Sequence, residues 1–241
     1  ARCLLVEEGD RLTLIDAGMG NKQSEKFFSY YHRWGEETLV SSIRKCGFSA
    51  DDVTDVFLTH LHFDHCGGGV IRVGEDSYKT TFKNAKYWSN KAHWEWATSP
   101  NKREVASFLK ENFVPVEESG QLNFLKKDEN NYLTHCDLGF DVLFVDGHTE
   151  KQMIPIINFK GQKIAFAADL IPTAGHVPLP YIPGYDIRPL TSLKEKESFL
   201  NFCIDNSVLL FFEHDAFEEL GLVHQTERGI RLKSTLKLLD L

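Results

Sequence analysis

The sequence lacks the features that mark membrane proteins and nucleic-acid-binding proteins. It contains no run of about 18 apolar residues, the length that a membrane-spanning helix needs, so we expect no membrane partner. It also lacks a basic excess, because 27 Lys and Arg stand against 35 Asp and Glu and the net charge is −8. Nucleic-acid binding depends on positive charge, so we expect no nucleic acid partner either.

Cysteine is scarce and follows no pattern. The cysteines are odd in number, scattered, and form no CxxC motif, which predicts reduced thiols in a cytoplasmic protein rather than a disulfide framework. The chain also begins without Met, at Ala1, inside an apolar run. A fold that lacks its first strands and a lost signal peptide therefore both stay open. The five cysteines are Cys3, Cys46, Cys66, Cys136 and Cys203.

Repeats, low-complexity tracts and clear linkers are absent as well, so residues 1–241 are predicted to form one domain. A chain of this length buries roughly 70–75% of its surface on folding and needs no disulfide bonds to be stable. β-rich and helix-periodic stretches alternate, which predicts an α/β fold. Strands are expected as a hairpin in 2–18 and at 53–59, 84–88, 140–146, 153–159, 163–169 and 208–214. Helices are expected at 22–34, 36–46, 89–113 and 193–205, and a long irregular loop at 172–189.

The sequence does contain metal-competent side chains at the ends of predicted strands. The stretch "THLHFDHCGGG" (59–69) places three histidines and one aspartate within six positions. Four apolar strands run directly into His60, His148, Asp169 and His214. Because α/β sheets bind ligands at the carboxyl ends of their strands, we expect these groups to lie close together.

The donor types favour zinc. Imidazole nitrogens combined with carboxylates suit Zn, with Mn, Fe or Co also feasible, whereas Ca and Mg prefer oxygen. Five histidines and two aspartates exceed the four ligands of one tetrahedral zinc, so they divide better between two divalent ions that share a carboxylate. The seven predicted ligands are His60, His62, Asp64, His65, His148, Asp169 and His214.

These motifs resemble the metallo-β-lactamase fold superfamily. The resemblance lies in "LIDAG", "HLHFDH", "GHT", "AAD" and "EHD", which span about residues 16–215. It implies an αβ/βα four-layer sandwich with the metals at one edge of two facing sheets. It also implies a role for each matching residue: His60, His62 and His148 on one ion, Asp64, His65 and His214 on the other, Asp169 bridging, and Asp16 supporting a ligand.

Within the superfamily the sequence looks most like the N-acyl homoserine lactonases and the methyl parathion hydrolase group. It departs from the lactonases in having Pro172 where they carry a tyrosine, and in reading "GHTEKQM" where many members read "GHTPGH". Tyr181 or Tyr185, in the loop after Asp169, could replace that tyrosine as a hydrogen-bond donor. Asp64 could pass a proton to the leaving group, in competition with its role as a ligand.

The predicted function is hydrolysis of a small ester, lactone or phosphotriester by a hydroxide that bridges the two metal ions. A thioesterase of glyoxalase II type, a non-catalytic metal-binding regulatory protein and an iron-dependent oxidative enzyme remain alternatives. The expected partner is a small-molecule substrate, and a homodimer stays open.

Several nearby residues fit ordinary packing better than chemistry. Trp94, Trp96 and Phe108 are expected to pack along a helix rather than to form a lid. Cys66 is expected to be a small buried hydrophobe, and the glycines at 67–69 to allow a tight turn. His176 is a further candidate for the pocket, because its loop follows Asp169.

Overall fold

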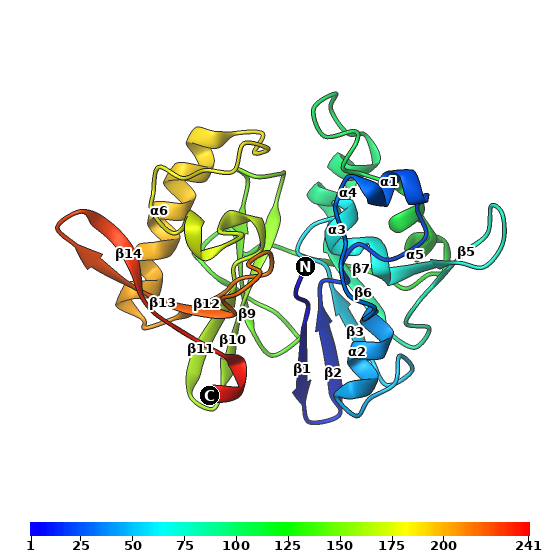
Figure 1. Cartoon of the computed structure of the whole chain (residues 1–241), viewed down its shortest axis with the longest axis horizontal. Coiled ribbons are helices and arrows are strands. Elements are labelled where there is room, and N and C mark those ends of the chain that lie inside the picture. The colour runs from blue at the N-terminus through cyan, green and yellow to red at the C-terminus, as the bar shows by residue number, and fades with distance from the viewer. The chain divides into compact units, whose positions relative to one another are not determined.

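A computed structural model describes residues 1–241 and divides the chain into two compact units. The N-terminal unit comprises Ala1 and Cys3–Leu125, and the C-terminal unit comprises Arg2 and Lys126–Leu241. Each unit contains one large β-sheet (Figure 1). That the two units form a single domain stays a prediction of the sequence.

The N-terminal unit is built on a five-stranded sheet in which four strands run parallel. The first strand pairs antiparallel with the second, which confirms the predicted hairpin, and the remaining pairs are all parallel. The parallel strands therefore all end at the same edge of the sheet. Their order is β1 (Leu4–Glu8), β2 (Arg11–Ile15), β3 (Asp55–Phe57), β6 (Lys86–Asn90) and β7 (Leu122–Leu125).

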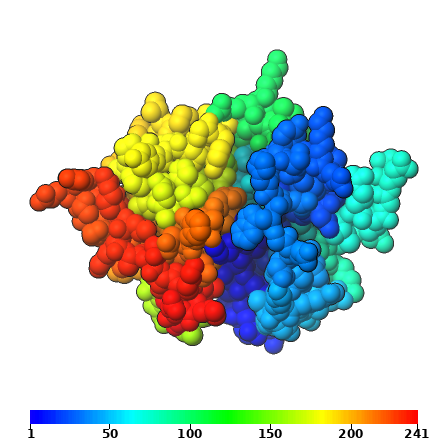
Figure 2. All heavy atoms as spheres, in the orientation of Figure 1, coloured from blue at the N-terminus to red at the C-terminus, as the bar shows by residue number.

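Short helices and one hairpin complete this unit. The hairpin of β4 (Val70–Arg72) and β5 (Tyr78–Thr80) projects from the unit as the cyan protrusion in Figure 2. A buried apolar cluster includes residues of β2, β3 and β6 and of the helices behind them. The helices are α1 (Glu25–Ser29), α2 (Leu39–Lys45), α3 (Phe63–Cys66), α4 (Lys91–Thr98) and α5 (Val114–Glu118).

All three predicted helices of this unit are shorter than expected, and the one predicted at 36–46 is formed at Leu39–Lys45. The helix predicted at 22–34 is formed only at Glu25–Ser29, because His32 and Gly35 take positive φ angles of 45° and 78° that end the helical path. The helix predicted at 89–113 ends at Thr98. Ser99 precedes Pro100, and a residue before proline is disfavoured in the helical conformation.

The C-terminal unit is built on a seven-stranded mixed sheet. The strands predicted from residues 140 to 214 are confirmed, whereas the antiparallel pairing of residues 220–226 with residues 229–236 was not predicted. The sheet order is β14 (Gly229–Leu236), β13 (Leu220–Thr226), β12 (Leu209–Phe211), β11 (Gln162–Phe166), β10 (Gln152–Phe159), β9 (Asp141–Val145) and β8 (Thr134–His135).

Three strands of this sheet share one direction although they are not all neighbours. β9 and β11 both pair antiparallel with β10, and β12 pairs parallel with β11. The carboxyl ends of β9, β11 and β12 therefore lie at one edge of the sheet, and these are the ends that precede three of the predicted metal ligands.

The helix α6 (Pro189–Asp205) is the long helix of the C-terminal unit. Its buried residues recur at helical spacing and unexpectedly include a lysine. They are Ser192, Lys196, Phe199, Leu200 and Cys203. Burying each of the larger apolar side chains contributes about 1.5–3 kcal/mol. No helix of the protein combines the length and apolar character required to cross a membrane.

Candidate metal centre

The histidine cluster of the N-terminal unit follows β3 and forms the turn into α3. The fully buried ring of His60 faces that of His62, with His60 Nε2 and His62 Nδ1 3.1 Å apart. His65 is also fully buried, and its Nε2 lies 3.9 Å from the Asp64 carboxylate, which is 27% exposed. The four predicted ligands of this unit thus form two adjacent pairs of donor groups.

Asp16, at the end of β2, orients this cluster. One carboxylate oxygen lies 2.9 Å from His65 Nδ1 and accepts the Thr59 hydroxyl at 2.7 Å, while the other accepts the Thr59 backbone N–H at 2.7 Å. Since the Thr59 hydroxyl donates to Asp16, it accepts from His60 Nδ1 at 3.1 Å. Asp16 therefore holds the Nδ1 side of His65 directly and that of His60 through Thr59, so that Nε2 is the nitrogen of each ring that can bind a metal. These contacts agree with the predicted supporting role of Asp16.

Close approach of neighbouring backbone explains two of the three glycines after the cluster. A Cβ on Gly68 would lie 2.1 Å from the Ala17 carbonyl oxygen, and one on Gly67 would lie 2.2 Å from the Met19 carbonyl oxygen. The expected tight turn is confirmed, since 67–69 form a buried 3₁₀ turn. Cys66 is fully buried, and burial raises the pKa of its thiol to about 12, so it behaves as the predicted small hydrophobe.

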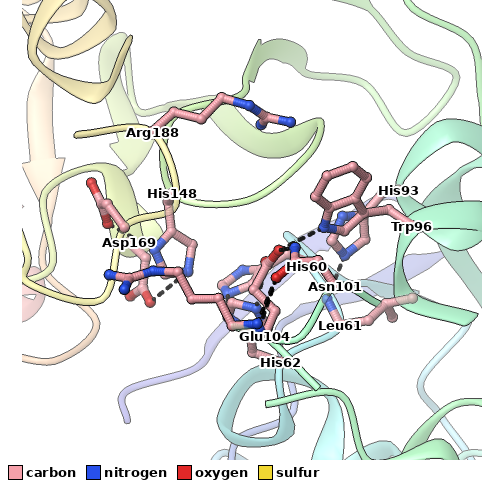
Figure 3. Close-up of polar contacts among 12 residues, drawn as sticks. His60, Leu61, His62, His93, Trp96, Asn101, Glu104, His148, Asp169 and Arg188 are labelled. Atoms are coloured by element: carbon pink, nitrogen blue, oxygen red, sulfur yellow. Dashed lines mark hydrogen bonds and ion pairs between the residues drawn. The ribbon is translucent and has the colours of Figure 1, made fainter. Parts of the chain in front are cut away.

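The donor groups of the C-terminal unit gather around Asp169. Its Oδ2 lies 3.1 Å from His148 Nε2 and its Oδ1 lies 3.0 Å from His214 Nε2, so each carboxylate oxygen faces a different histidine. Figure 3 shows the contact between His148 and Asp169. Asp169 is 5% exposed and sits in a short 3₁₀ turn after β11, preceded by Ala168 with a positive φ of 42°. Strain of this kind is common where a loop presents a functional group.

A second carboxylate orients His148. Asp186 Oδ1 lies 3.0 Å from His148 Nδ1, and Asp186 Oδ2 accepts the hydroxyl of Ser192, on the first turn of α6. This contact directs His148 Nε2 towards Asp169. Gly147 allows the arrangement, because a Cβ there would lie 2.4 Å from the Ser192 backbone nitrogen. Asp186 was not predicted, since a lone aspartate in a long loop gives no sequence signal.

Two further residues of the N-terminal unit contact the histidine turn and were also missed. His93 accepts the backbone N–H of Leu61 at Nε2 (2.8 Å) and so fixes the chain between His60 and His62. Glu104 lies 3.4 Å from His62 Nε2 (Figure 3). Trp94 and Phe108 belong to the buried core and Trp96 packs against it and donates to Glu104, but Phe108 lies beyond the end of α4, so the three side chains do not share one helix as predicted.

The predicted loop candidates differ in their surroundings. The Tyr185 ring meets the His148 ring edge-on at 5.5 Å between centroids and remains 54% exposed. Tyr181 is 60% exposed, and its carbonyl oxygen accepts from Lys196. His176 pairs with the Thr173 hydroxyl at 2.8 Å, and burial lowers its pKa. The role of each stays a prediction.

The donor chemistry fits a divalent transition metal. In each unit, buried imidazole nitrogens lie beside a carboxylate, and the second ring nitrogen of His60, His65 and His148 is held by an oxygen. Such oxygen partners fix the tautomer that leaves the other nitrogen available to a metal. Comparison with known proteins supports the same conclusion, because residues 1–202 match the model of the metallo-beta-lactamase superfamily. The chain belongs to this superfamily.

Relatives within the metallo-β-lactamase superfamily share most of the chain. An N-acyl homoserine lactonase of Bacillus cereus is 25% identical over 233 residues, which cover 91% of this chain and 82% of the relative. A structure from Staphylococcus aureus described as a "probable metal-dependent hydrolase" superposes with a TM-score of 0.83 at 24% identity. The superposition covers 97% of this chain and 80% of the Staphylococcus aureus chain.

AidC, described as a dizinc quorum-quenching lactonase, superposes with a TM-score of 0.77 at 24% identity, over 98% of this chain and 80% of its own. At this level of identity the two structures establish the fold alone. The predicted metallo-β-lactamase fold is therefore confirmed, with mixed sheets and helices in an α/β arrangement.

Proposed function

We propose that this protein is a metal-dependent hydrolase that uses two divalent ions to open a small lactone or cleave a related ester or phosphotriester. Membership of the metallo-β-lactamase superfamily and similarity to enzymes named N-acyl homoserine lactonase support hydrolysis and favour a lactone. The donor types support zinc as the ion.

The observation that carries the proposal is the arrangement around Asp169. One carboxylate oxygen faces His148 and the other faces His214, at 3.1 and 3.0 Å. A carboxylate with a different histidine on each oxygen is suited to bridge two ions. The pairing of His60 Nε2 with His62 Nδ1, at 3.1 Å, likewise offers two nitrogens to one ion.

The proposed ligand sets combine donors of both units. Bound divalent ions would lower the pKa of coordinated water and polarise the substrate oxygen. Asp169 is proposed to be shared between the ions. The first set is His60, His62 and His148, and the second is Asp64, His65 and His214.

Other side chains are proposed to act on the substrate directly. The Asp64 carboxylate, 27% exposed, is accessible enough to pass a proton to the leaving group. Tyr185 is favoured over Tyr181 as the hydrogen-bond donor that replaces the missing lactonase tyrosine, because its ring contacts the His148 ring. The Tyr185 hydroxyl would orient the substrate carbonyl.

The first test is the variant His62→Ala. Removing one of two facing imidazoles should reduce bound metal and abolish turnover of an N-acyl homoserine lactone, because the ligand set is incomplete. Metal content would be measured by elemental analysis and turnover on a panel of lactone, thioester and phosphotriester substrates. His135→Ala is the matched control, since His135 is an exposed histidine outside both clusters.

Full turnover by metal-free protein would refute the proposal. Activity confined to the thioester would move the substrate to the glyoxalase II type. One tightly bound ion per chain would refute the dinuclear arrangement while leaving metal dependence intact.

A further inference from the structure

The loop that precedes α6, drawn in yellow in Figure 1, is poor in backbone hydrogen-bond donors. Its stretch "PLPYIP" (178–183) contains three prolines, and proline has no backbone N–H, so six carbonyl groups stand beside three N–H groups. Two of these donors are used inside the stretch, by Tyr181 on the Pro178 carbonyl at 3.0 Å and by Ile182 on that of Pro180 at 3.1 Å. Carbonyl groups here that turn away from water therefore need donors from elsewhere in the C-terminal unit.

A single lysine of α6 supplies those donors. Lys196 Nζ donates to the carbonyl oxygens of Pro178 and Tyr181, both at 2.9 Å, and its side chain is fully buried. It also donates to the Leu179 carbonyl oxygen at 3.3 Å. A protonated amine has three N–H donors and a neutral amine has two, so three carbonyl contacts match the ammonium form. Burial lowers the pKa of Lys196 to about 8, which leaves the amine mostly protonated at neutral pH.

The three carbonyl groups have the chemistry of a site for a monovalent cation. Backbone carbonyl oxygens can replace the hydration shell of such an ion, as they do in the filters of potassium channels. Burying an ammonium is unfavourable unless hydrogen bonds compensate its desolvation, and here the carbonyl oxygens provide them. The cation of this site is attached to the protein, because it belongs to the side chain of Lys196.

The same face of α6 also holds the other end of the loop. Ser192 and Lys196 are four residues apart, so they lie on one face of the helix, and both are buried. The Ser192 hydroxyl donates to Asp186 Oδ2, and Asp186 Oδ1 lies 3.0 Å from His148 Nδ1. The segment from 178 to 186 is thus fixed at both ends by neighbouring turns of one helix.

We propose that Lys196 is a positioning residue whose ammonium acts as the bound cation of a carbonyl site formed by residues 178–181 and so fixes the conformation of the loop. If the side chain is removed, the site should take a primary alkylammonium ion, because such an ion brings the same three N–H donors. The consequence for hydrolysis rests on the proposed function, since Asp186 orients His148 and Tyr185 is the proposed donor to the substrate. The conformation of the loop does not depend on it.

The first test is chemical rescue of Lys196→Ala. This variant lacks the atoms beyond Cβ, which correspond to one propylammonium ion. Hydrogen exchange of the metal-free protein at pH 7 should increase across residues 178–188, and propylammonium chloride should restore protection in a saturable manner. Tetramethylammonium chloride, which has the charge but no N–H, and 1-propanol, which has the chain length but no charge, should not. Lys194→Ala, on the exposed side of α6, should leave the exchange unchanged.

The second measurement is turnover of an N-acyl homoserine lactone by the metal-loaded protein. In Lys196→Ala the carboxylate that orients His148 loses its fixed position, so turnover should fall about 10- to 100-fold. Propylammonium should raise turnover again, relative to the reaction without enzyme, at the same concentrations that restore protection of the loop. A general loss of stability would not respond to the shape and the donors of the added ion.

Lys196→Met separates positioning from folding. It keeps an unbranched side chain of similar length without the N–H donors, so it should fold and show the same increase in exchange across 178–188. Unchanged exchange in Lys196→Met would overturn the inference. So would a Lys196→Ala loop that propylammonium does not protect, or that tetramethylammonium protects equally well. A wild-type protein without hydrolase activity would instead overturn the proposed function, and the exchange data would still decide the role of Lys196.

Discussion

At the residue scale, the site contains histidines in which one ring nitrogen points towards the proposed metal position and the other contacts an oxygen of the protein. Asp16 holds His65 directly, and Asp186 holds His148. Fixing the ring in this way determines both the tautomer and the direction of the second ring nitrogen, so these proposed ligands are preorganised for metal binding. A histidine of the same turn without such a partner would be a weaker ligand.

Glycine is required at residue 68 for a steric reason. A Cβ there would lie 2.1 Å from the Ala17 carbonyl oxygen, and the backbone would have to move to remove this clash. We expect Gly68→Ala to lower the free energy of unfolding by about 1–3 kcal/mol or more, as overpacking does. Chemical denaturation would measure the change.

Gly184→Ala is the control for this prediction, because a Cβ at residue 184 meets nothing within 4 Å. Equal destabilisation by both substitutions would mean that the close approach at residue 68 is not what requires glycine.

At the element scale, the loop before α6 is held by a buried lysine. Lys196, on α6, donates to the carbonyl oxygens of Pro178 and Tyr181, both at 2.9 Å, and to that of Leu179 at 3.3 Å. The segment that carries Tyr185 and Asp186 is therefore tied to the helix through one side chain. Burial lowers the pKa of Lys196 from 10.5 to about 8.

The lowered pKa of Lys196 predicts a pH-dependent stability. Between pH 8 and 10.5 the unfolded chain binds more protons at Lys196 than the folded chain does, so this residue's contribution to stability rises with pH. The free energy of unfolding of the wild type relative to Lys196→Met should increase from pH 7 to pH 10, by up to about 3 kcal/mol.

Lys194→Met, on the exposed side of α6, is the control and should show no comparable trend. A difference that falls as pH rises would show that the three carbonyl contacts of Lys196 outweigh burial and keep its ammonium charged.

At the scale of the whole molecule, the proposed ligands are distributed over both compact units. Ions that bind only the folded chain stabilise it, by about 4 kcal/mol when their concentration is a thousand times the dissociation constant. Chelation should therefore lower the melting temperature and increase amide hydrogen exchange around His60 and around Asp169 together.

Hydrogen exchange followed by mass spectrometry would check this prediction, with His62→Ala as the control in which chelation has a much smaller effect. Increased exchange around only one of the two segments would contradict this prediction and would mean that the ions bind through the donors of that segment alone.

The sequence by itself determined where the proposed ligands stand along the chain. The strands before His60, His148, Asp169 and His214 were predictable because short apolar runs between turn signals are a local pattern, and the donors follow those runs directly. The prediction was less accurate for the helices, since the ends near residues 30 and 98 depend on single backbone angles and on Pro100.

Only the tertiary structure decided what holds the ligands in place. Asp186 and Glu104 come from irregular loops, 38 residues after His148 and 42 residues after His62, and no periodic pattern marks them. Their importance depends on which oxygen approaches which ring nitrogen, and that contact exists only after the loops have packed against the strands. The positions of the proposed ligands are a property of local sequence here, whereas their orientation is a property of packing.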